Sequence, residues 1–172
     1  MDGAIHPGED LPAFVREVML PCCTAERPRI DPAASRFRLR LGESHIHRWG
    51  VYADEDIPPR RRVIEYTGER ITLREGYRRR LRPQLYLFRC SARRLIDGGI
   101  GGSGAERINH GCEPNLVARF DHRRVFYLSL RPIVAGEELL IDYHVRGDID
   151  PIPCCCGAPS CRGYLNEPDA SG

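Results

Sequence analysis

Residues 107–115 read RINHGCEPN, so an asparagine, a histidine, a cysteine and a proline turn fall within nine positions. A glycine-rich run, residues 97–104, stands just before them. Near the other end of the chain, residues 154–161 read CCCGAPSC. A lone cysteine in mid-chain and a cysteine cluster near the end are typical of a metal ion that joins two distant segments. We therefore expect the middle of the chain and its end to meet in space.

Three cysteines of the second segment follow a C-x-C-x4-C spacing: Cys154, Cys156 and Cys161. A structural zinc ion takes four thiolate or imidazole ligands in a tetrahedron. Three ligands from one tight loop leave one corner open, and we expect Cys112 to fill it. His110 and His144 are the alternative fourth ligands, and a set of unpaired thiols is the alternative to a metal site. The prediction is one structural zinc ion.

The other cysteines show no ligand pattern: Cys22, Cys23, Cys90 and Cys155. We expect Cys155 to be a bystander in the metal loop and the other three to be buried or incidental thiols. The first residues have neither a basic region nor an apolar core of a secretory signal. We therefore expect an intracellular protein, in the nucleus or the cytoplasm, where reduced thiols favour metal over disulfides.

Composition and charge exclude several classes of protein. The 172 residues suit a single domain, and 41% hydrophobic with 29% charged residues is ordinary for a globular chain. No apolar run approaches the roughly 20 residues that span a bilayer, so we expect no membrane insertion. A net charge of +2 gives no indication of direct nucleic-acid binding. The sequence does not indicate an oligomeric state.

Short alternating and apolar runs predict a β-rich fold. Strands are expected at 36–44, 50–53, 62–69, 85–90 and 94–97, and in two runs within 124–145. Helical character is limited to a short amphipathic stretch at 13–20 and to residues 72–84, where we expect Gly76 to break the helix and Pro83 to end it. Many short strands with few helices predict several small sheets.

Two further patterns carry less information by themselves. The glycine run lacks the G-K-[ST] ending of a phosphate loop, and the chain contains no lysine to supply one, because all 26 basic residues are arginine. A flexible turn before a buried strand is the better interpretation. Glu138, Asp142 and Tyr143 place a phenol beside a carboxylate at the end of an apolar run, where a tyrosine is most often part of the core.

Taken together, these segments resemble the SET-domain protein lysine methyltransferases over about residues 36–166. Five segments carry the resemblance in the same order: HRWGVYADEDIPPRRRVIEYTGE at 47–69, YLF and LID at 86–97, RINHGCEPN at 107–115, EELLIDY at 137–143 and CCCGAPSCRGYLN at 154–166. The last of these is similar to the post-SET motif of the family. The order of the five segments makes chance agreement improbable.

The resemblance implies a SET fold of small curled β-sheets with a C-terminal pseudoknot and a post-SET zinc loop. In such a fold the C-terminal strand threads beneath a loop and brings Asn109 and His110 next to Asp142 and Tyr143. The implied division is a loop-rich N-terminal extension at 1–35, a SET domain at 36–145, a linker at 146–153, a post-SET zinc motif at 154–166 and a tail at 167–172.

The resemblance also implies S-adenosylmethionine as methyl donor and a lysine of a protein, a histone or another, as acceptor. Tyr143 falls on the catalytic tyrosine of the family. The residues implied to hold the cofactor are Arg48, Trp49, Gly50, Tyr86, Asn109, His110 and Leu165. Only a neutral amine is a nucleophile, and burial beside a sulfonium disfavours the ammonium form, so no strong base is obligatory.

The sequence departs from the family pattern at two positions. Gly111 stands where the signature has serine, and Ile141 stands where phenylalanine or tyrosine is frequent. Ile141, with Phe88 on the other side, is implied to line the substrate channel, and an aliphatic residue there favours higher methylation states. These departures leave open a SET-fold module that binds a peptide or partner without turnover. The arginine triplets at 60–62 and 78–80 leave open a zinc-ribbon nucleic-acid binder.

Overall fold

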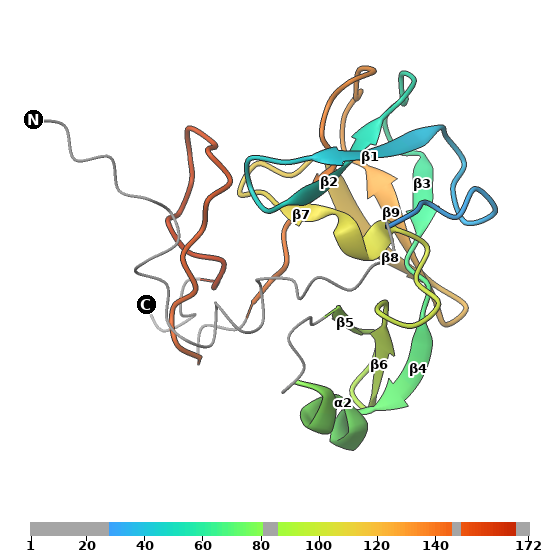
Figure 1. Ribbon diagram of the computed structural model, residues 1–172, viewed down its shortest axis with the longest axis vertical. Coiled ribbons are helices and arrows are strands. Elements are labelled where there is room, and N and C mark those ends of the chain that lie inside the picture. The colour runs from blue at the N-terminus through green and yellow to red at the C-terminus, as the bar shows by residue number, and fades with distance from the viewer. Residues whose placement is uncertain (1–27, 81–85, 146–148, 168–172) are drawn as a thin grey trace, which may run out of the picture.

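The computed structural model describes residues 28–80, 86–145 and 149–167 (Figure 1). The helix expected at 13–20 and the cysteines at 22 and 23 lie outside these residues. Within the described chain the structure is β-rich, with one short α-helix and several small sheets, which confirms the predicted fold class. No helix in the described chain is long and apolar enough to cross a membrane.

Three sheets make up the described part of the fold. A two-stranded sheet consists of β1 (Leu39–Glu43) and β2 (Trp49–Ala53). A three-stranded sheet, in the order β4-β6-β5, consists of β4 (Glu69–Thr72), β6 (Arg94–Asp97) and β5 (Leu87–Arg89). A five-stranded sheet, in the order β3-β9-β8-β10-β7, consists of β3 (Arg62–Glu65), β9 (Arg124–Ser129), β8 (Leu116–Asp121), β10 (Leu140–Ile141) and β7 (Asn109–His110). The helices are α2 (Leu73–Arg79) and the short 3-10 turn η1 (Ala105–Arg107).

The arrangement of β10 determines which residues can meet. It runs between β7 and β8 and is parallel to both, with Ile141 opposite His110 on one side and Leu116 on the other. Two segments that are far apart in the sequence, 109–110 and 140–141, therefore become neighbouring strands. In this way Asn109 and His110 come next to Asp142 and Tyr143, as the threading predicted.

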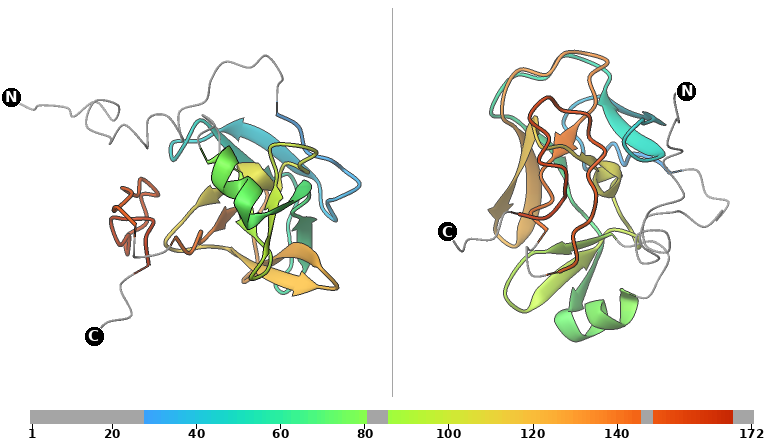
Figure 2. Two further views of the ribbon diagram at one scale, coloured as in Figure 1. Left: turned by 90° about the horizontal axis from the view of Figure 1, so that it is seen from below. Right: turned by 90° about the vertical axis from the view of Figure 1, so that its left-hand side faces the viewer.

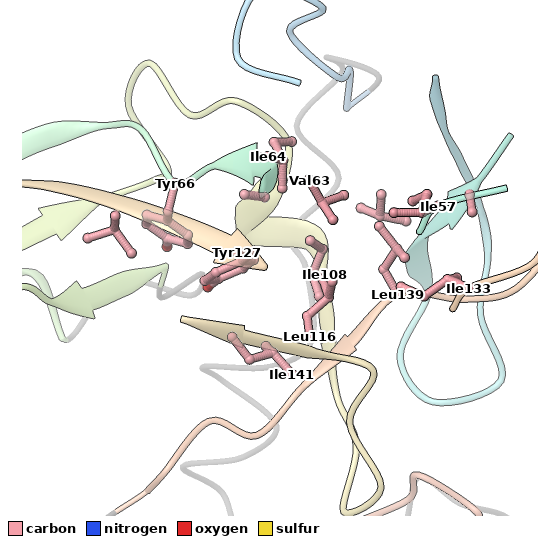
Figure 3. Packing of buried hydrophobic residues seen from close by; sticks show 14 of the residues in the cluster. Ile57, Val63, Ile64, Tyr66, Ile108, Leu116, Tyr127, Ile133, Leu139 and Ile141 are labelled. Atoms are coloured by element: carbon pink, nitrogen blue, oxygen red, sulfur yellow. The ribbon is translucent and has the colours of Figure 1, made fainter. Parts of the chain in front are cut away.

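One hydrophobic cluster lies between the two-stranded and five-stranded sheets and continues toward the three-stranded one (Figure 3). Its most deeply buried aliphatic members are Val51, Ile57, Val63, Ile64, Ile108, Leu116, Val125, Ile133 and Leu139. Tyr66 and Tyr127 extend it at one end. Among the described residues, every member of this cluster comes from the chain before Asp142.

The structure corrects two details of the sequence prediction. The expected strand at 62–69 is divided into β3 and β4 at Gly68, which has φ 152°, and a Cβ there would lie 2.3 Å from the backbone oxygen of Asp97. Gly76 does not break the helix, because α2 runs through it. A Cβ at Gly76 would lie 2.2 Å from Leu95 Cδ1, so the glycine lets the helix pack closely on β6.

Residues 149–167, here called the C-terminal loop, contain no extended strand and lie to one side of the sheets (Figure 2). Their backbone is held by local pairs: the N–H of Leu165 donates to the oxygen of Ile152 at 2.8 Å, and that of Cys154 to the oxygen of Gly163 at 2.9 Å. Residues 152–154 thus pair with residues 163–165. The predicted linker includes residues 152 and 153, and the predicted zinc motif includes the others. The domain boundaries stay a prediction.

Candidate active site and metal centre

A cavity of about 850 Å³ lies between the sheets and the C-terminal loop. One wall comes from the start of β2, from β5, η1, β7, β8 and β9, and from the end of β10. The C-terminal loop supplies the other wall through Ile149, Ile152 and Leu165. Such a volume is in the range of sites for drug-sized ligands and cofactors.

Most of the predicted site residues line this cavity: Arg48, Trp49, Tyr86, Phe88, Asn109, Ile141, Tyr143 and Leu165. Two predicted residues, Gly50 and His110, lie behind the lining. Gly50 has its α-carbon against Glu138, where an added Cβ would lie 2.3 Å from Oε1. His110 is 3% exposed and sits between the cavity and the cysteine cluster.

Three contacts fix Tyr143 against Ile108 and His110, at and just before strand β7. Its hydroxyl donates to the backbone oxygen of Ile108 at 2.9 Å, and its backbone N–H donates to Nδ1 of His110 at 3.2 Å. The two rings meet edge to face with centroids 5.4 Å apart. Withdrawal of the hydroxyl from water, with the nearby charges of Tyr86 and Glu138, raises the pKa of Tyr143. The phenol is therefore protonated near neutral pH.

His110 links Tyr143 to the cysteine cluster. Because Nδ1 accepts the Tyr143 N–H, a neutral ring carries its proton on Nε2, which lies 3.5 Å from the Sγ of Cys112. Burial lowers the pKa of His110, which favours this neutral form. The ring thus contacts the phenol-bearing strand and the sulfur cluster at the same time.

Glu138 organises the opposite side of the site, a role that the sequence did not reveal. Nδ2 of Asn109 donates to Oε1 of Glu138 at 2.9 Å and to the backbone oxygen of Trp49 at 3.0 Å. The hydroxyls of Ser44 and Tyr52 donate to the other carboxylate oxygen. These bonds hold the start of β2 against β7, where the predicted cofactor residues lie.

Arg107 is a second cavity residue to which the sequence gave no role. Its guanidinium lies 4.5 Å from the ring centre of Tyr86 and donates to the Tyr86 hydroxyl. Its Nε is buried and forms no hydrogen bond in the described part of the chain, but it lies 3.6 Å from Oε1 of Glu106. Together with Arg48 it gives this end of the cavity two cationic side chains.

The four predicted metal ligands meet at one point. The sulfurs of Cys112, Cys154, Cys156 and Cys161 all lie within 4.8 Å of one another, and two of the separations from Cys112 are 3.8 and 3.9 Å. Four sulfurs at about 2.3 Å from a central zinc ion are about 3.8 Å apart in a regular tetrahedron, whereas a disulfide requires about 2.05 Å. The donor set and its spacing fit a zinc ion.

Of the two alternative ligands, His110 borders the cluster at 3.5 Å from Cys112 Sγ without being one of its four members, whereas His144 and the other thiols lie elsewhere. His144 is exposed and pairs with Glu167, with 2.6 Å between Nδ1 and Oε1. Cys155 is exposed, as expected of a bystander. Cys90 is partly buried against the core, and its thiol donates to the oxygen of Arg94. None of these residues belongs to the cysteine cluster.

One ion pair also fastens the C-terminal loop to β10. Arg162 donates to both carboxylate oxygens of Asp142, at 2.6 and 2.8 Å, and to the backbone oxygen of Leu165 at 2.8 Å. Burial raises the pKa of Asp142, but the bonds from Arg162 and from the His144 N–H outweigh it and lower that pKa to about 2. Arg162 therefore connects Asp142, the neighbour of Tyr143, to Leu165, which lines the cavity from the C-terminal loop.

The geometry of the site agrees with comparisons to known proteins. The family model of the SET domain matches residues 48–144. The chain belongs to the SET-domain family. Its cysteine cluster is the post-SET cluster that the resemblance implied.

Several relatives of this SET chain have been described in fungi and animals. The H3 lysine-4 specific histone-lysine N-methyltransferase of Schizosaccharomyces pombe is 41% identical over 143 residues, which cover 77% of this chain and 16% of that protein. The enzyme of the same description from Saccharomyces cerevisiae is 41% identical over 141 residues, with 74% and 13% covered. Histone-lysine N-methyltransferase set-2 of Caenorhabditis elegans is 38% identical over 138 residues, with 74% and 9% covered. The SET chain thus spans less than a fifth of the length of these relatives.

One solved structure has a similar fold. A chain of apo ctPRC2 with substitutions in Ezh2 matches with a TM-score of 0.57 and 33% sequence identity. The match covers 60% of this chain and 14% of that chain.

Proposed function

We propose that the chain is an S-adenosylmethionine-dependent protein-lysine N-methyltransferase. The observation that carries the proposal is that Tyr143, whose hydroxyl is held by the Ile108 carbonyl, lines one large cavity together with Asn109 and with Leu165 of the C-terminal loop. Membership of the SET family and relatives that are histone-lysine methyltransferases support the same activity.

The cavity suits the methyl donor by its chemistry. Arg48 and Arg107 offer cationic groups for the carboxylate of its methionine part, and Arg107 also pairs with Glu106, with 3.6 Å between Nε and Oε1. Tyr86 and Leu165 offer apolar surface for the rest of the molecule. When bound, S-adenosylmethionine supplies the methyl group, whose carbon bonds to the lysine nitrogen as its bond to sulfur breaks and leaves the electron pair on sulfur.

The acceptor lysine enters the same cavity as a neutral amine. Apolar residues of the lining, Phe88 and Ile141, withdraw the amine from water and so disfavour its ammonium form. The Tyr143 oxygen accepts a hydrogen bond from the amine and so orients the lone pair of the amine nitrogen. The phenol keeps its own proton, which it donates to the Ile108 carbonyl oxygen. After transfer, the extra proton leaves from nitrogen to solvent.

The zinc ion has a structural role in this proposal. Four cysteine ligands leave no open position for substrate, so zinc would position the C-terminal loop rather than react. Metal analysis of the purified chain should find about one zinc per chain, and Cys112→Ser should lower it. Full zinc content in that variant would show that Cys112 is not the fourth ligand.

For the substrate, we propose a histone lysine. The relatives from both yeasts are described as specific for lysine-4 of histone H3, and the N-terminal tail of H3 is therefore the first substrate to test. A histone substrate would place the protein in the nucleus. Direct contact with nucleic acid forms no part of this proposal, and no oligomeric state is assigned.

The direct test is methyl transfer from labelled S-adenosylmethionine to histone H3 and to a proteome extract. The label should appear on lysine and disappear with Tyr143→Phe. Since the chain has no lysine, labelled lysine cannot come from the chain itself. An unlabelled extract, with H3 also unlabelled, would refute the activity.

The competing hypothesis of a binding module has less support. Its motivation was Gly111 in place of serine and Ile141 in place of an aromatic residue. At position 111, an added Cβ would lie 2.9 Å from Leu140 Cδ1. Gly111 thus lets β7 and β10 approach each other, which assembles the site. A module without turnover would show peptide binding and no transferred label.

A further inference from the structure

Tyr127 on β9 carries a buried hydroxyl group to which the proposed mechanism gives no role. The residue is only 3% exposed and lines the cavity. In the part of the chain that the structure describes, no group forms a hydrogen bond with this hydroxyl. By contrast, the hydroxyl of Tyr66 donates to the backbone oxygen of Tyr86 at 2.7 Å, and that of Tyr143 donates to Ile108.

An unpartnered hydroxyl is unusual at this degree of burial. Buried polar groups are paired in most proteins, because a group withdrawn from water without a partner costs free energy. In the described chain, Arg107 Nε is the one side-chain polar atom that is fully enclosed and forms no hydrogen bond. The Tyr127 hydroxyl, which also lacks a hydrogen bond, is therefore not fully enclosed. The Tyr127 hydroxyl therefore reaches the cavity surface, where a ligand can pair with it.

The surroundings of Tyr127 are those of a channel for an alkyl amine. Its ring centre lies 5.9 Å from that of Tyr66 and 6.2 Å from that of Phe88, and these two are 5.1 Å apart. Figure 3 shows Tyr66, Tyr127 and Ile141 at the same end of the cluster. Burial raises the pKa of Tyr127, so the hydroxyl is neutral, and Tyr127 lines the same cavity as Tyr143.

From this geometry we infer that Tyr127 is a specificity-determining residue that limits how many methyl groups the acceptor lysine receives. The inference rests on the proposed methyltransferase function. The Tyr127 hydroxyl accepts an N–H of the amine, and each methyl group added to nitrogen removes one N–H. Further methylation then leaves the hydroxyl and a methyl group facing each other without a hydrogen bond.

Ile141 has no polar group, which leaves Tyr127 to supply the hydroxyl that limits methylation. It stands two positions before Tyr143 and carries no polar group, so it cannot hold the amine by itself. Tyr127 brings a hydroxyl to the same channel from a different strand. We therefore expect the product of the wild-type chain to be mainly the monomethylated lysine, in contrast to the higher states expected from Ile141 alone.

The test compares Tyr127→Phe with the wild type on an H3 tail peptide, with products counted by mass spectrometry. Losing one hydrogen bond to a buried group corresponds to about a tenfold change. The ratio of the second to the first methyl-transfer rate should rise about tenfold in Tyr127→Phe, while the first transfer is retained. Tyr66→Phe, which removes a hydroxyl that already has a protein partner, is the matched control and should leave the ratio unchanged.

Binding separates this inference from the proposed function. Calorimetry with H3 peptides carrying zero, one, two or three methyl groups, in the presence of S-adenosylhomocysteine, should show affinity falling with each methyl in the wild type and a flatter series in Tyr127→Phe. That result without any methyl transfer would refute the enzyme and leave Tyr127 as a group that distinguishes methylation states in peptide binding only. An unchanged rate ratio, or parallel series in the two proteins, would overturn the inference while the enzyme stands.

Discussion

The two walls of the cavity are held in place by different forces. On the sheet side, β-strands from three sheets surround a cluster of buried aliphatic side chains. On the other side, the C-terminal loop has no extended strand among its described residues and contributes nothing to that cluster. Its attachments are the four cysteine sulfurs, the Asp142–Arg162 ion pair and a few backbone bonds.

This difference separates the stability of the fold from the completeness of the site. Burial of apolar surface stabilises the sheet side at about 25 cal/mol per Å², whether or not a metal is bound. The loop buries Leu165 and Cys156 but adds no residue to the core cluster, so we expect its position to depend on the metal ion and on charge. The same protein can therefore remain folded and yet lack one wall of its cavity.

The largest effect is expected from removing the metal. Cys154→Ser should abolish zinc binding, and methyl transfer should fall by at least about 10²-fold, because structural zinc contributes of the order of 10 kcal/mol to ordering its ligands. Far-UV circular dichroism should still report the β-sheets. Zinc is measured by metal analysis and activity with labelled donor.

Cys155→Ser is the matched control, since it removes an exposed thiol of the same segment that lies outside the cluster. It should leave zinc content and activity unchanged. If Cys154→Ser unfolded the sheets as well, the two walls would form one cooperative unit and the comparison would be wrong.

The next largest effect concerns the group that the sheet side supplies to the chemistry. Tyr143→Phe should lower kcat by about 10²-fold, the usual loss when one oriented hydrogen-bonding group is removed from an active site. Zinc content and the affinity for S-adenosylmethionine, measured by calorimetry, should stay the same. Tyr164→Phe, which alters an exposed tyrosine of the C-terminal loop, serves as control. A kcat close to that of the wild type would remove Tyr143 from the mechanism.

Much of the site could be predicted because its residues stand in short ordered motifs. The ligand spacing in 154–161 and the lone Cys112 indicated the cysteine cluster, and the sulfurs do meet. The prediction of a β-rich fold followed from short alternating and apolar runs. Such signals are local in the sequence, so they survive without knowledge of the tertiary structure.

Other features depend on contacts between distant segments and left no local signal. Glu138 is one acidic residue among 24, and its importance comes from Asn109 and Gly50 being folded against it. Gly76 looks like a helix breaker until the proximity of Leu95 is known. Strand β8 was not predicted, although it pairs with β9 along its whole length.

A smaller effect should test the sheet side without touching the metal. Gly68→Ala should lower the free energy of unfolding by about 2–3 kcal/mol, because its φ of 152° is unfavourable for alanine and the new Cβ would meet the Asp97 backbone. Gly136→Ala has φ 92° but open space around it, so it should lose only about 1 kcal/mol. Urea denaturation measures both. Equal losses would show that the close approach to β6 is unimportant.

The smallest effect should come from the charge that joins the two walls. Asp142→Asn keeps an acceptor for Arg162 but removes one of the two charges, which weakens a partly buried ion pair by about 1 kcal/mol. Because Arg162 also holds the backbone of Leu165, the KM for S-adenosylmethionine should rise about fivefold, with zinc content unchanged. Asp150→Asn, an exposed carboxylate of the same loop, is the control. An unchanged KM in Asp142→Asn would mean that zinc alone positions the loop, whereas a lower kcat with unchanged KM would place Asp142 in the positioning of Tyr143 instead.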